Sequence, residues 1–182
     1  MRLDRLNVAV IAADGFEEAE LTEPVKALKA AGAHVDVISL KPGEIQGVRH
    51  MDKSIRVKVD KTLDEIKADA YDAVVLPGGA LNADRMRVEP KLQQLLRTFD
   101  QNGKPIAAIC HAPWELVSAG LTRGRKLTAY HTIQDDIRNA GGMFQDQEVL
   151  VDNNWVTSRQ PSDLPAFNRE MMQLFEHAPV AR

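Results

Sequence analysis

Residues 105–112 read Pro-Ile-Ala-Ala-Ile-Cys-His-Ala, and this stretch decides the fold class. Residues 105–109 form a short apolar run, which is typical of a strand buried on both faces of a parallel sheet. The run leads straight into Cys110, and the residues that follow predict a helix from about His111 to Ala119, ended by Gly120. The stretch therefore places a cysteine at the junction between a buried strand and a helix.

The same alternation of apolar runs and helical segments continues on the N-terminal side. Buried strands are predicted at Val8–Ala12 and Ala73–Leu76, and an alternating, β-branched strand is predicted at His34–Leu40. A helix from Glu17 to Ala31 joins the first two, and Pro24 is expected to split it because proline suits a first turn better than a helix interior. This βαβ unit implies parallel strands and a right-handed crossover. The pattern predicts a single α/β domain over residues 1–182, built as a three-layer sandwich.

The remaining segments are expected to complete this domain. They are a hairpin within residues 44–59 around Gly47 that adds to the sheet, a weak helix Thr62–Lys67, an amphipathic helix Pro90–Asn102, a helix Thr132–Ala140, a hairpin Glu148–Ser158 that turns at Asn153-Asn154, and a last helix Asp163–His177 capped by Ser162. The sequence shows no internal repeat, low-complexity stretch or linker.

Composition excludes several classes of protein. The 182 residues carry a net charge of −3, and the short basic segment Arg123-Gly-Arg-Lys126 is no nucleic-acid patch, so no nucleic acid is expected as a partner. The N-terminus is charged where a signal peptide is apolar, and no apolar run approaches the roughly 20 residues that span a bilayer. One cysteine cannot form an internal disulfide, which fits a reducing compartment. We therefore expect a cytoplasmic protein without membrane contact.

Cys110 is the candidate nucleophile. Sites in open α/β sheets form at the carboxyl ends of the strands, and the N–H groups at a helix start favour a thiolate. Ala108 and Ala112 are small residues two places either side of Cys110, as the tight turn of a nucleophile elbow requires. The alternative is a small buried side chain that closes the strand. His111 follows directly, as a catalytic base or as a helix-capping or surface histidine.

Two neighbouring segments add groups that such a nucleophile needs. Pro77-Gly78-Gly79 ends the strand at Ala73–Leu76, and its glycines allow backbone N–H groups to approach an oxyanion, although a simple turn is the alternative. Asp14-Gly-Phe-Glu-Glu-Ala-Glu20 ends the first strand. Helical spacing brings Glu17 and Glu20 together and turns Glu18 elsewhere. One of these glutamates is expected to be a protonated partner of Cys110, since two adjacent negative charges repel, whereas others serve the helix dipole.

These segments resemble the ThiJ/PfpI family. The likeness rests on Phe16-Glu-Glu-Ala-Glu20, Val75-Leu-Pro-Gly-Gly79, Ala108-Ile-Cys-His-Ala-Pro113 and the later Leu-Thr-Ala, Asp-Gln-Glu-Val and Thr-Ser-Arg segments. It runs from about Asn7 to Phe175 and is strongest for PfpI-type intracellular proteases and bacterial general stress proteins. The resemblance implies a flavodoxin-like α/β/α sandwich with a mostly parallel sheet, and a homodimer or a higher homo-oligomer.

The resemblance also implies roles for individual residues. It makes Cys110 the nucleophile, His111 its neighbour in the triad, Glu20 the hydrogen-bond partner of the cysteine and Glu17 the second acid of that segment. It places Gly78, Gly79 and the His111 N–H at the oxyanion site and Tyr130 near it. It also makes Asp84 an acid that an adjacent subunit donates to the triad. Two residues depart from the family pattern. Ala112 replaces a glycine, which narrows the pocket, and Asp84 is one carbon shorter than the usual glutamate, which puts the triad across subunits in doubt.

Three functions compete on these residues. The first is a stress-related cysteine hydrolase of the PfpI type, in which Cys110 attacks a peptide carbonyl and His111 transfers protons. The second is a cofactor-free glyoxalase III or deglycase that acts on methylglyoxal or glycated adducts. In it Cys110 forms a hemithioacetal with a 2-oxoaldehyde such as methylglyoxal, and Glu20 or His111 moves the proton. The third is a redox sensor or stress-protective protein that acts through oxidation of Cys110. A small pocket favours the second.

Neither a metal nor a nucleotide cofactor is expected. The five histidines show no ligand spacing, and a single cysteine cannot build a structural zinc site. The sequence also lacks a Gly-x-Gly-x-x-Gly segment and a phosphate-binding loop. The expected partners are therefore a small carbonyl compound or a peptide as substrate, and further copies of the chain.

Overall fold

The computed structural model describes residues 2–179, and its centre is a seven-stranded sheet. The strands are β1 (Asn7–Ile11), β3 (His34–Ser39), β6 (Lys61–Thr62), β7 (Ala73–Leu76), β8 (Ile106–Ile109), β11 (Val149–Asp152) and β12 (Trp155–Ser158). Their order is β11-β12-β8-β7-β1-β3-β6, and all neighbours are parallel except β11 and β12. The sheet is therefore mostly parallel, as predicted.

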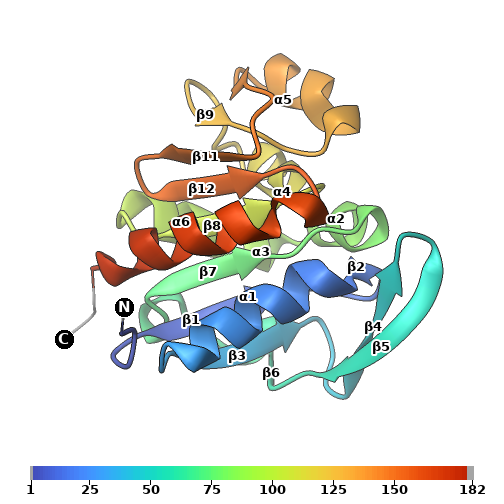
Figure 1. Cartoon of the computed structure of the whole chain (residues 1–182), viewed down its shortest axis with the longest axis vertical. Coiled ribbons are helices and arrows are strands. Elements are labelled where there is room, and N and C mark those ends of the chain that lie inside the picture. Colours follow the sequence, from blue (N-terminus) through green and yellow to red (C-terminus); the bar gives the residue numbers. More distant parts are fainter. Residues whose placement is uncertain (1, 180–182) are drawn as a thin grey trace.

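Helices cover both faces of this sheet. On one face α1 (Glu18–Ala30) and α6 (Leu164–Glu176) lie side by side, in front of the strands in Figure 1. The other layer contains α2 (Ala80–Met86), α3 (Pro90–Gln101), α4 (Pro113–Ser118) and α5 (Gln134–Asn139). The side chains of β1 point alternately to the two faces of the sheet. Val8 and Val10 belong to the core beneath α1 and α6, whereas Ala9 and Ile11 belong to the core that contains Leu96 of α3. This is the predicted three-layer sandwich.

A second, three-stranded sheet stands at the edge where β1, β7 and β8 end (Figure 1). It contains β2 (Phe16–Glu17), β4 (Glu44–Arg49) and β5 (Asp52–Lys58). The prediction that the hairpin of residues 44–59 adds to the main sheet is therefore wrong, and its turn lies at His50-Met51 rather than at Gly47. Gly47 lies inside β4 because the Phe16 ring fills the space of a side chain, 2.8 Å from where a Cβ would stand.

Two helix predictions are also wrong in detail. Pro24 does not split α1, because it lies on the buried face with Leu21 and Leu28, where core packing outweighs the missing N–H. Ser162 does not cap α6, since its hydroxyl is hydrogen-bonded to Gln160 and the 3₁₀ turn η4 (Pro161–Asp163) precedes the helix.

Several short helices and strands differ from the prediction, because the helix and strand propensities of so few residues are weak. The predicted helix Thr62–Lys67 is reduced to the 3₁₀ turn η1 (Leu63–Glu65), which η2 (Ala68–Ala70) follows. The predicted helix Thr132–Ala140 consists of η3 (His131–Ile133) and α5. Neither α2 nor the small pair β9 (Lys126–Leu127) and β10 (Met143–Phe144) is predicted by the sequence pattern. No helix within residues 2–179 combines the length and apolarity that crossing a membrane requires.

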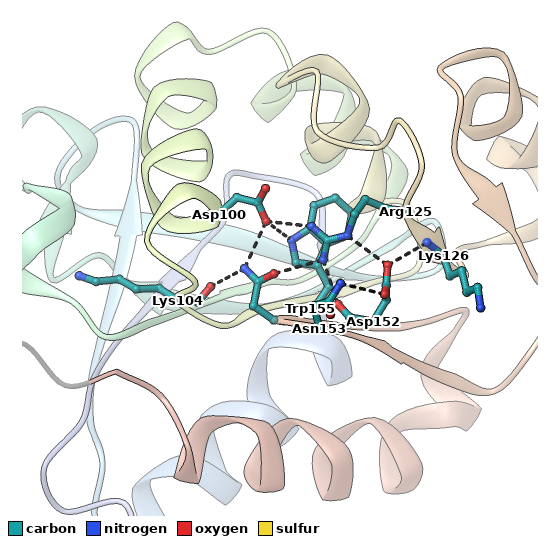
Figure 2. Close-up of polar contacts among 8 residues, drawn as sticks. Asp100, Lys104, Arg125, Lys126, Asp152, Asn153 and Trp155 are labelled. Carbon is teal, nitrogen blue, oxygen red and sulfur yellow. Dashed lines mark hydrogen bonds and ion pairs between the residues drawn. The ribbon is translucent and has the colours of Figure 1, made fainter.

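A dense polar network surrounds the beginnings of β8 and β12. Figure 2 shows the Arg125 guanidinium between two carboxylates. It donates to Asp100 at 3.0 Å and to Asp152 at 3.1 Å, and it lies 3.7 Å from the centre of the Trp155 ring. The Trp155 indole N–H and the Asn154 amide also donate to Asp100, at 2.8 and 3.2 Å. Each of these buried or half-buried polar groups thus has a partner, so the network ties the two strand beginnings together.

Candidate active site

Cys110 lies at the end of β8 in a strained backbone conformation. Its φ is +63°, a left-handed value that few residues other than glycine adopt. Its N–H donates to the Ser158 carbonyl of β12 at 3.0 Å, and its carbonyl accepts from the Tyr130 N–H at 2.8 Å. These bonds hold the turn in place. The helix that follows, α4, begins at Pro113 rather than at His111 and has only six residues.

Glu20 of α1 is buried beside this cysteine. Its Oε2 accepts the Gly78 N–H at 2.9 Å, and the carboxyl also interacts with the Cys110 thiol. Its Oε1 is buried without a nitrogen or oxygen partner anywhere in residues 2–179. A buried carboxyl with an unpaired oxygen is far less costly in the protonated form, which can donate to a neighbouring acceptor.

The pKa values of Glu20 and Cys110 are both displaced. Burial, with the charge of Glu17 as a second cause, raises the pKa of Glu20 to about 8, although its contacts with Cys110 and Gly78 act the other way. Burial and the charge of Glu20 also raise the pKa of the Cys110 thiol, against the N–H groups of Gly79 and His111. The expectation that the helix start lowers this pKa is corrected, because burial outweighs the two N–H groups. At neutral pH Glu20 holds a proton, which removes its repulsion of a thiolate.

His111 faces the sulfur from the next position in the chain. Its Nδ1 lies 3.1 Å from Cys110 Sγ, and its Nε2 lies 3.4 Å from the Thr132 hydroxyl. Its ring stacks on Tyr130 with the ring centres 4.7 Å apart, and it meets the edge of Trp114. Burial, assisted by the charge of His131, lowers the pKa of His111. His111 is therefore a neutral imidazole whose Nδ1 faces the thiol.

Sequence reasoning missed Thr132. Its only signal was its place at the beginning of a predicted helix, which does not reveal that its hydroxyl reaches the histidine. In the described chain no carboxylate is hydrogen-bonded to His111, so Thr132 is the partner that one copy of the protein supplies.

Both glycines of Pro77-Gly78-Gly79 are required by close approach. A Cβ on Gly78 would stand 2.3 Å from Glu20 Oε2 and 2.6 Å from Cys110 Cβ. Gly79 has φ +90°, and a Cβ there would stand 2.2 Å from the Gly15 carbonyl. The Gly78 N–H is engaged by Glu20, so it is not free for an oxyanion. The N–H groups of Gly79 and His111 both reach the sulfur and are the donors that remain.

The other predicted site residues fall in two groups. Glu17 and Tyr130 line the same pocket as Cys110, and the Glu17 carboxylate accepts the His50 N–H at 3.0 Å. Glu18 turns outward to Arg49, as its helical position predicts. Asp84 lies exposed on α2 and is not among the residues that line the pocket, so its role across subunits stays a prediction.

The pocket above Cys110 has a volume of about 480 Å³. Two segments that the sequence did not reveal form part of its wall, the turn of the β4–β5 hairpin and the loop between β12 and α6. They contribute His50, Met51, Gln160, Pro161 and Ser162. Their composition carries no chemical motif, and only folding brings them to the cysteine.

The comparison with protein families agrees with this geometry, because the DJ-1/PfpI family matches residues 6–174. The chain belongs to the DJ-1/PfpI family. This confirms the resemblance that the glutamate, glycine and cysteine segments indicated. The match includes every predicted site residue.

Known members of the family are similar over nearly their whole length. "Deglycase PfpI" of Pyrococcus furiosus is 43% identical over 94% of this chain and 100% of its own. "Putative cysteine protease YraA" of Bacillus subtilis is 40% identical over 93% of this chain and 98% of its own. The solved structure "Toxoplasma gondii DJ-1, oxidized" has a TM-score of 0.83 and 32% identity, covering 93% of this chain and 90% of its own.

Proposed function

We propose that this DJ-1/PfpI protein is a cofactor-free, cysteine-dependent deglycase that acts on adducts of α-oxoaldehydes and on the free aldehydes themselves. The observation that carries the proposal is the grouping of one thiol, one buried carboxyl and one neutral imidazole in one pocket. Cys110 supplies the nucleophile, and His111 Nδ1, 3.1 Å away, supplies the base. Glu20 is a carboxylic acid whose pKa of about 8 lets it both give and take a proton near neutral pH.

The first step forms a carbon–sulfur bond. The thiol proton passes to His111, and the sulfur adds to the aldehyde carbon of methylglyoxal to give a hemithioacetal. With a glycated amine the same carbon loses its bond to nitrogen, and the amine leaves with a proton from His111. The N–H groups of Gly79 and His111 stabilise the negative oxygen.

The later steps need only proton transfer and water. Glu20 in its ionised form takes the proton from the sulfur-bearing carbon and returns it to the adjacent carbon through an enediol. The hydroxyl proton passes to the former carbonyl oxygen, which leaves a lactoyl thioester on Cys110. Water then cleaves the thioester to lactate and the free thiol. One water is consumed in each cycle and the carbon skeleton undergoes an internal redox change, so no external oxidant is required.

A second candidate is peptide hydrolysis, which the name of the Bacillus subtilis relative favours. The same Cys110–His111 pair would attack a peptide carbonyl. In this case a carboxylate from another copy, Asp84 in our prediction, would orient His111, and the active form would be a homodimer or a larger assembly. Within residues 2–179 the Nε2 atom of His111 meets the neutral Thr132 hydroxyl and no carboxylate, so the geometry supports this candidate less well.

A third candidate is oxidation of Cys110 without turnover, as in a redox sensor. Protonated Glu20 and the two N–H groups would hold the oxidised sulfur as well as they hold a thiolate. It differs from the enzyme proposals in a simple way, because sulfur oxidation would be detected by mass spectrometry while no substrate is consumed.

The deciding experiment incubates the reduced protein with methylglyoxal and with its adduct on N-acetylated arginine amide, and follows D- and L-lactate. Lactate formed by the wild type and absent with Cys110→Ser supports the deglycase. Ser54→Ala is a matched control because it alters a hydroxyl in β5, outside the pocket. Absence of lactate together with cleavage of a peptide would overturn the deglycase in favour of the peptidase.

A further inference from the structure

The loop between β12 and α6 forms a polar part of the pocket wall. Gln160 and Ser162 both line the pocket, and their side chains are hydrogen-bonded to each other at 3.0 Å. An amide and a hydroxyl that share one bond keep further hydrogen-bonding capacity. Whichever way the amide is turned, the pair still presents at least one donor and one acceptor to a ligand.

This loop is held rigidly from behind. Arg159 makes two side-chain bonds to Asp163, at 2.9 and 3.0 Å, and its own N–H donates to the same carboxylate at 3.0 Å. A further bond of 2.9 Å joins Arg159 to Asp146. Asp163 is almost fully buried, so the five-residue loop is closed at its base by a bidentate ion pair. The Gln160–Ser162 pair is therefore preorganised, which lowers the entropy cost of binding.

The charge of the pocket limits what this pair can bind. None of the described residues that line the pocket is lysine or arginine, while Glu17 and Glu20 are both carboxyl groups. A carboxylate or phosphate would find no counterion here. A secondary amide carries no charge and offers one N–H donor and one carbonyl acceptor, which matches the two spare functions of the Gln160–Ser162 pair.

We propose that Gln160 and Ser162 form a subsite for a backbone-type amide, so that the enzyme selects α-oxoaldehyde adducts carried on acylated amino acids or peptides over free small aldehydes. The inference rests on the deglycase function proposed above. A pocket of about 480 Å³ has room for an adducted side chain beside Cys110 together with one amide.

The test compares two substrates on the same variants. For Gln160→Ala and Ser162→Ala we expect kcat/KM for the methylglyoxal adduct of N-acetylated arginine amide to fall about fivefold, the effect of one hydrogen bond. Activity on free methylglyoxal should fall by a clearly smaller factor than activity on the adduct, because that substrate carries no amide for the subsite. Ser162→Thr should restore activity on the adduct since it retains the hydroxyl. Gln173→Ala, on the exposed surface of α6, is the matched control.

The outcomes separate the two proposals. If the wild type forms lactate but the variants lose both activities equally, or lose neither, the subsite is wrong and the deglycase stands. If the wild type forms lactate from neither substrate, the deglycase proposal fails and the subsite fails with it. Circular dichroism shows whether each variant has folded, and the comparison of the two activities is made on folded variants.

Discussion

Buried polar groups are fully hydrogen-bonded at the beginnings of β8 and β12, but not at the ends of these strands. At their beginnings Arg125, Asp100 and Asp152 are joined by direct hydrogen bonds, and an aromatic ring covers the guanidinium (Figure 2). At their ends Cys110 has a strained φ, and Glu20 keeps an oxygen without a nitrogen or oxygen partner within residues 2–179. The sheet is the same, and only the residues that flank its strands differ.

This difference separates stability from chemistry. A network in which all partners are present has nothing left to offer a ligand, and removing one member leaves the others unpaired. A buried acid with an unpaired oxygen and a displaced pKa costs stability, but it can exchange a proton near neutral pH. We therefore expect substitutions at the Arg125 network to change unfolding, and substitutions around Cys110 to change activity.

The largest effect is expected from Gly78→Ala. The new methyl group would overlap both the Glu20 carboxyl and the Cys110 side chain, at 2.3 and 2.6 Å. Pushing these groups apart should lower lactate formation by at least about a hundredfold, since small misplacements at a reacting centre have effects of this size. Activity assays with circular dichroism would check this, and Ser54→Ala, which alters a side chain outside the pocket, is the control. Near-normal activity in a folded Gly78→Ala protein would contradict the proposed geometry.

Arg125→Ala tests the other end of the strands. Its side chain is only 15% exposed, and its loss leaves Asp100 and Asp152 without their cation. We expect the free energy of unfolding to fall by about 3 kcal/mol, as when one partner of a buried ion pair is removed. Urea denaturation measures this change. Where the variant is still folded, kcat/KM should stay within about twofold of the wild type, and a large loss of activity would break the comparison.

Glu20→Gln isolates the effect of the displaced pKa. The pKa of Glu20 is about 8 in the folded protein against 4.5 for an exposed glutamate in the unfolded chain, so the folded state holds a proton that the unfolded state has released between these pH values. Wild-type stability should therefore fall as pH rises from about 4.5 to about 8 by an amount on the order of 4 kcal/mol, and fall no further from this cause above pH 8. The difference between wild type and Glu20→Gln in urea denaturation should show this slope.

Glu18→Gln serves as the control for that experiment. The Arg49 guanidinium lowers the pKa of Glu18 in the folded protein. The ionised Glu18 therefore stabilises the fold above the pKa that it has in the unfolded chain, and this stabilisation is lost as the pH falls. The contribution of Glu18 to the free energy of unfolding therefore changes with pH in the opposite direction to that of Glu20. The same slope in both variants would show that Glu20 is not the cause.

The smallest effect is expected from Glu115→Leu in α4. This carboxyl is 1% exposed, neither oxygen has a hydrogen-bond partner within residues 2–179, and burial raises its pKa. Because an apolar side chain of similar size has no unpaired polar atom, we expect the variant to be more stable by about 1 to 3 kcal/mol. Thermal denaturation would measure the gain. Unchanged activity would show that Glu115, unlike Glu20, serves no chemical step.

Some of the candidate site was accessible from the sequence because its residues follow local rules. A cysteine between an apolar run and a helix, and a glycine pair after another run, are positions that a parallel sheet brings to one edge. The helical spacing from Glu17 to Glu20 likewise predicts which acids share a face. Other features were not accessible, among them the 3₁₀ turns and α2, because short elements depend on contacts more than on propensity.

By itself, then, the sequence determined three things: the parallel three-layer fold, the edge of the sheet at which Cys110 lies, and the family. The reason is that hydrophobic periodicity and glycine pairs can be recognised within short stretches of sequence. Only the tertiary structure decided that Thr132 meets His111, that burial raises the pKa of the thiol, and that Gln160 and Ser162 enter the pocket wall. Burial and long-range hydrogen bonds belong to pairs of residues far apart in the chain. Short stretches of sequence therefore do not predict these contacts, which form only when the layers pack together.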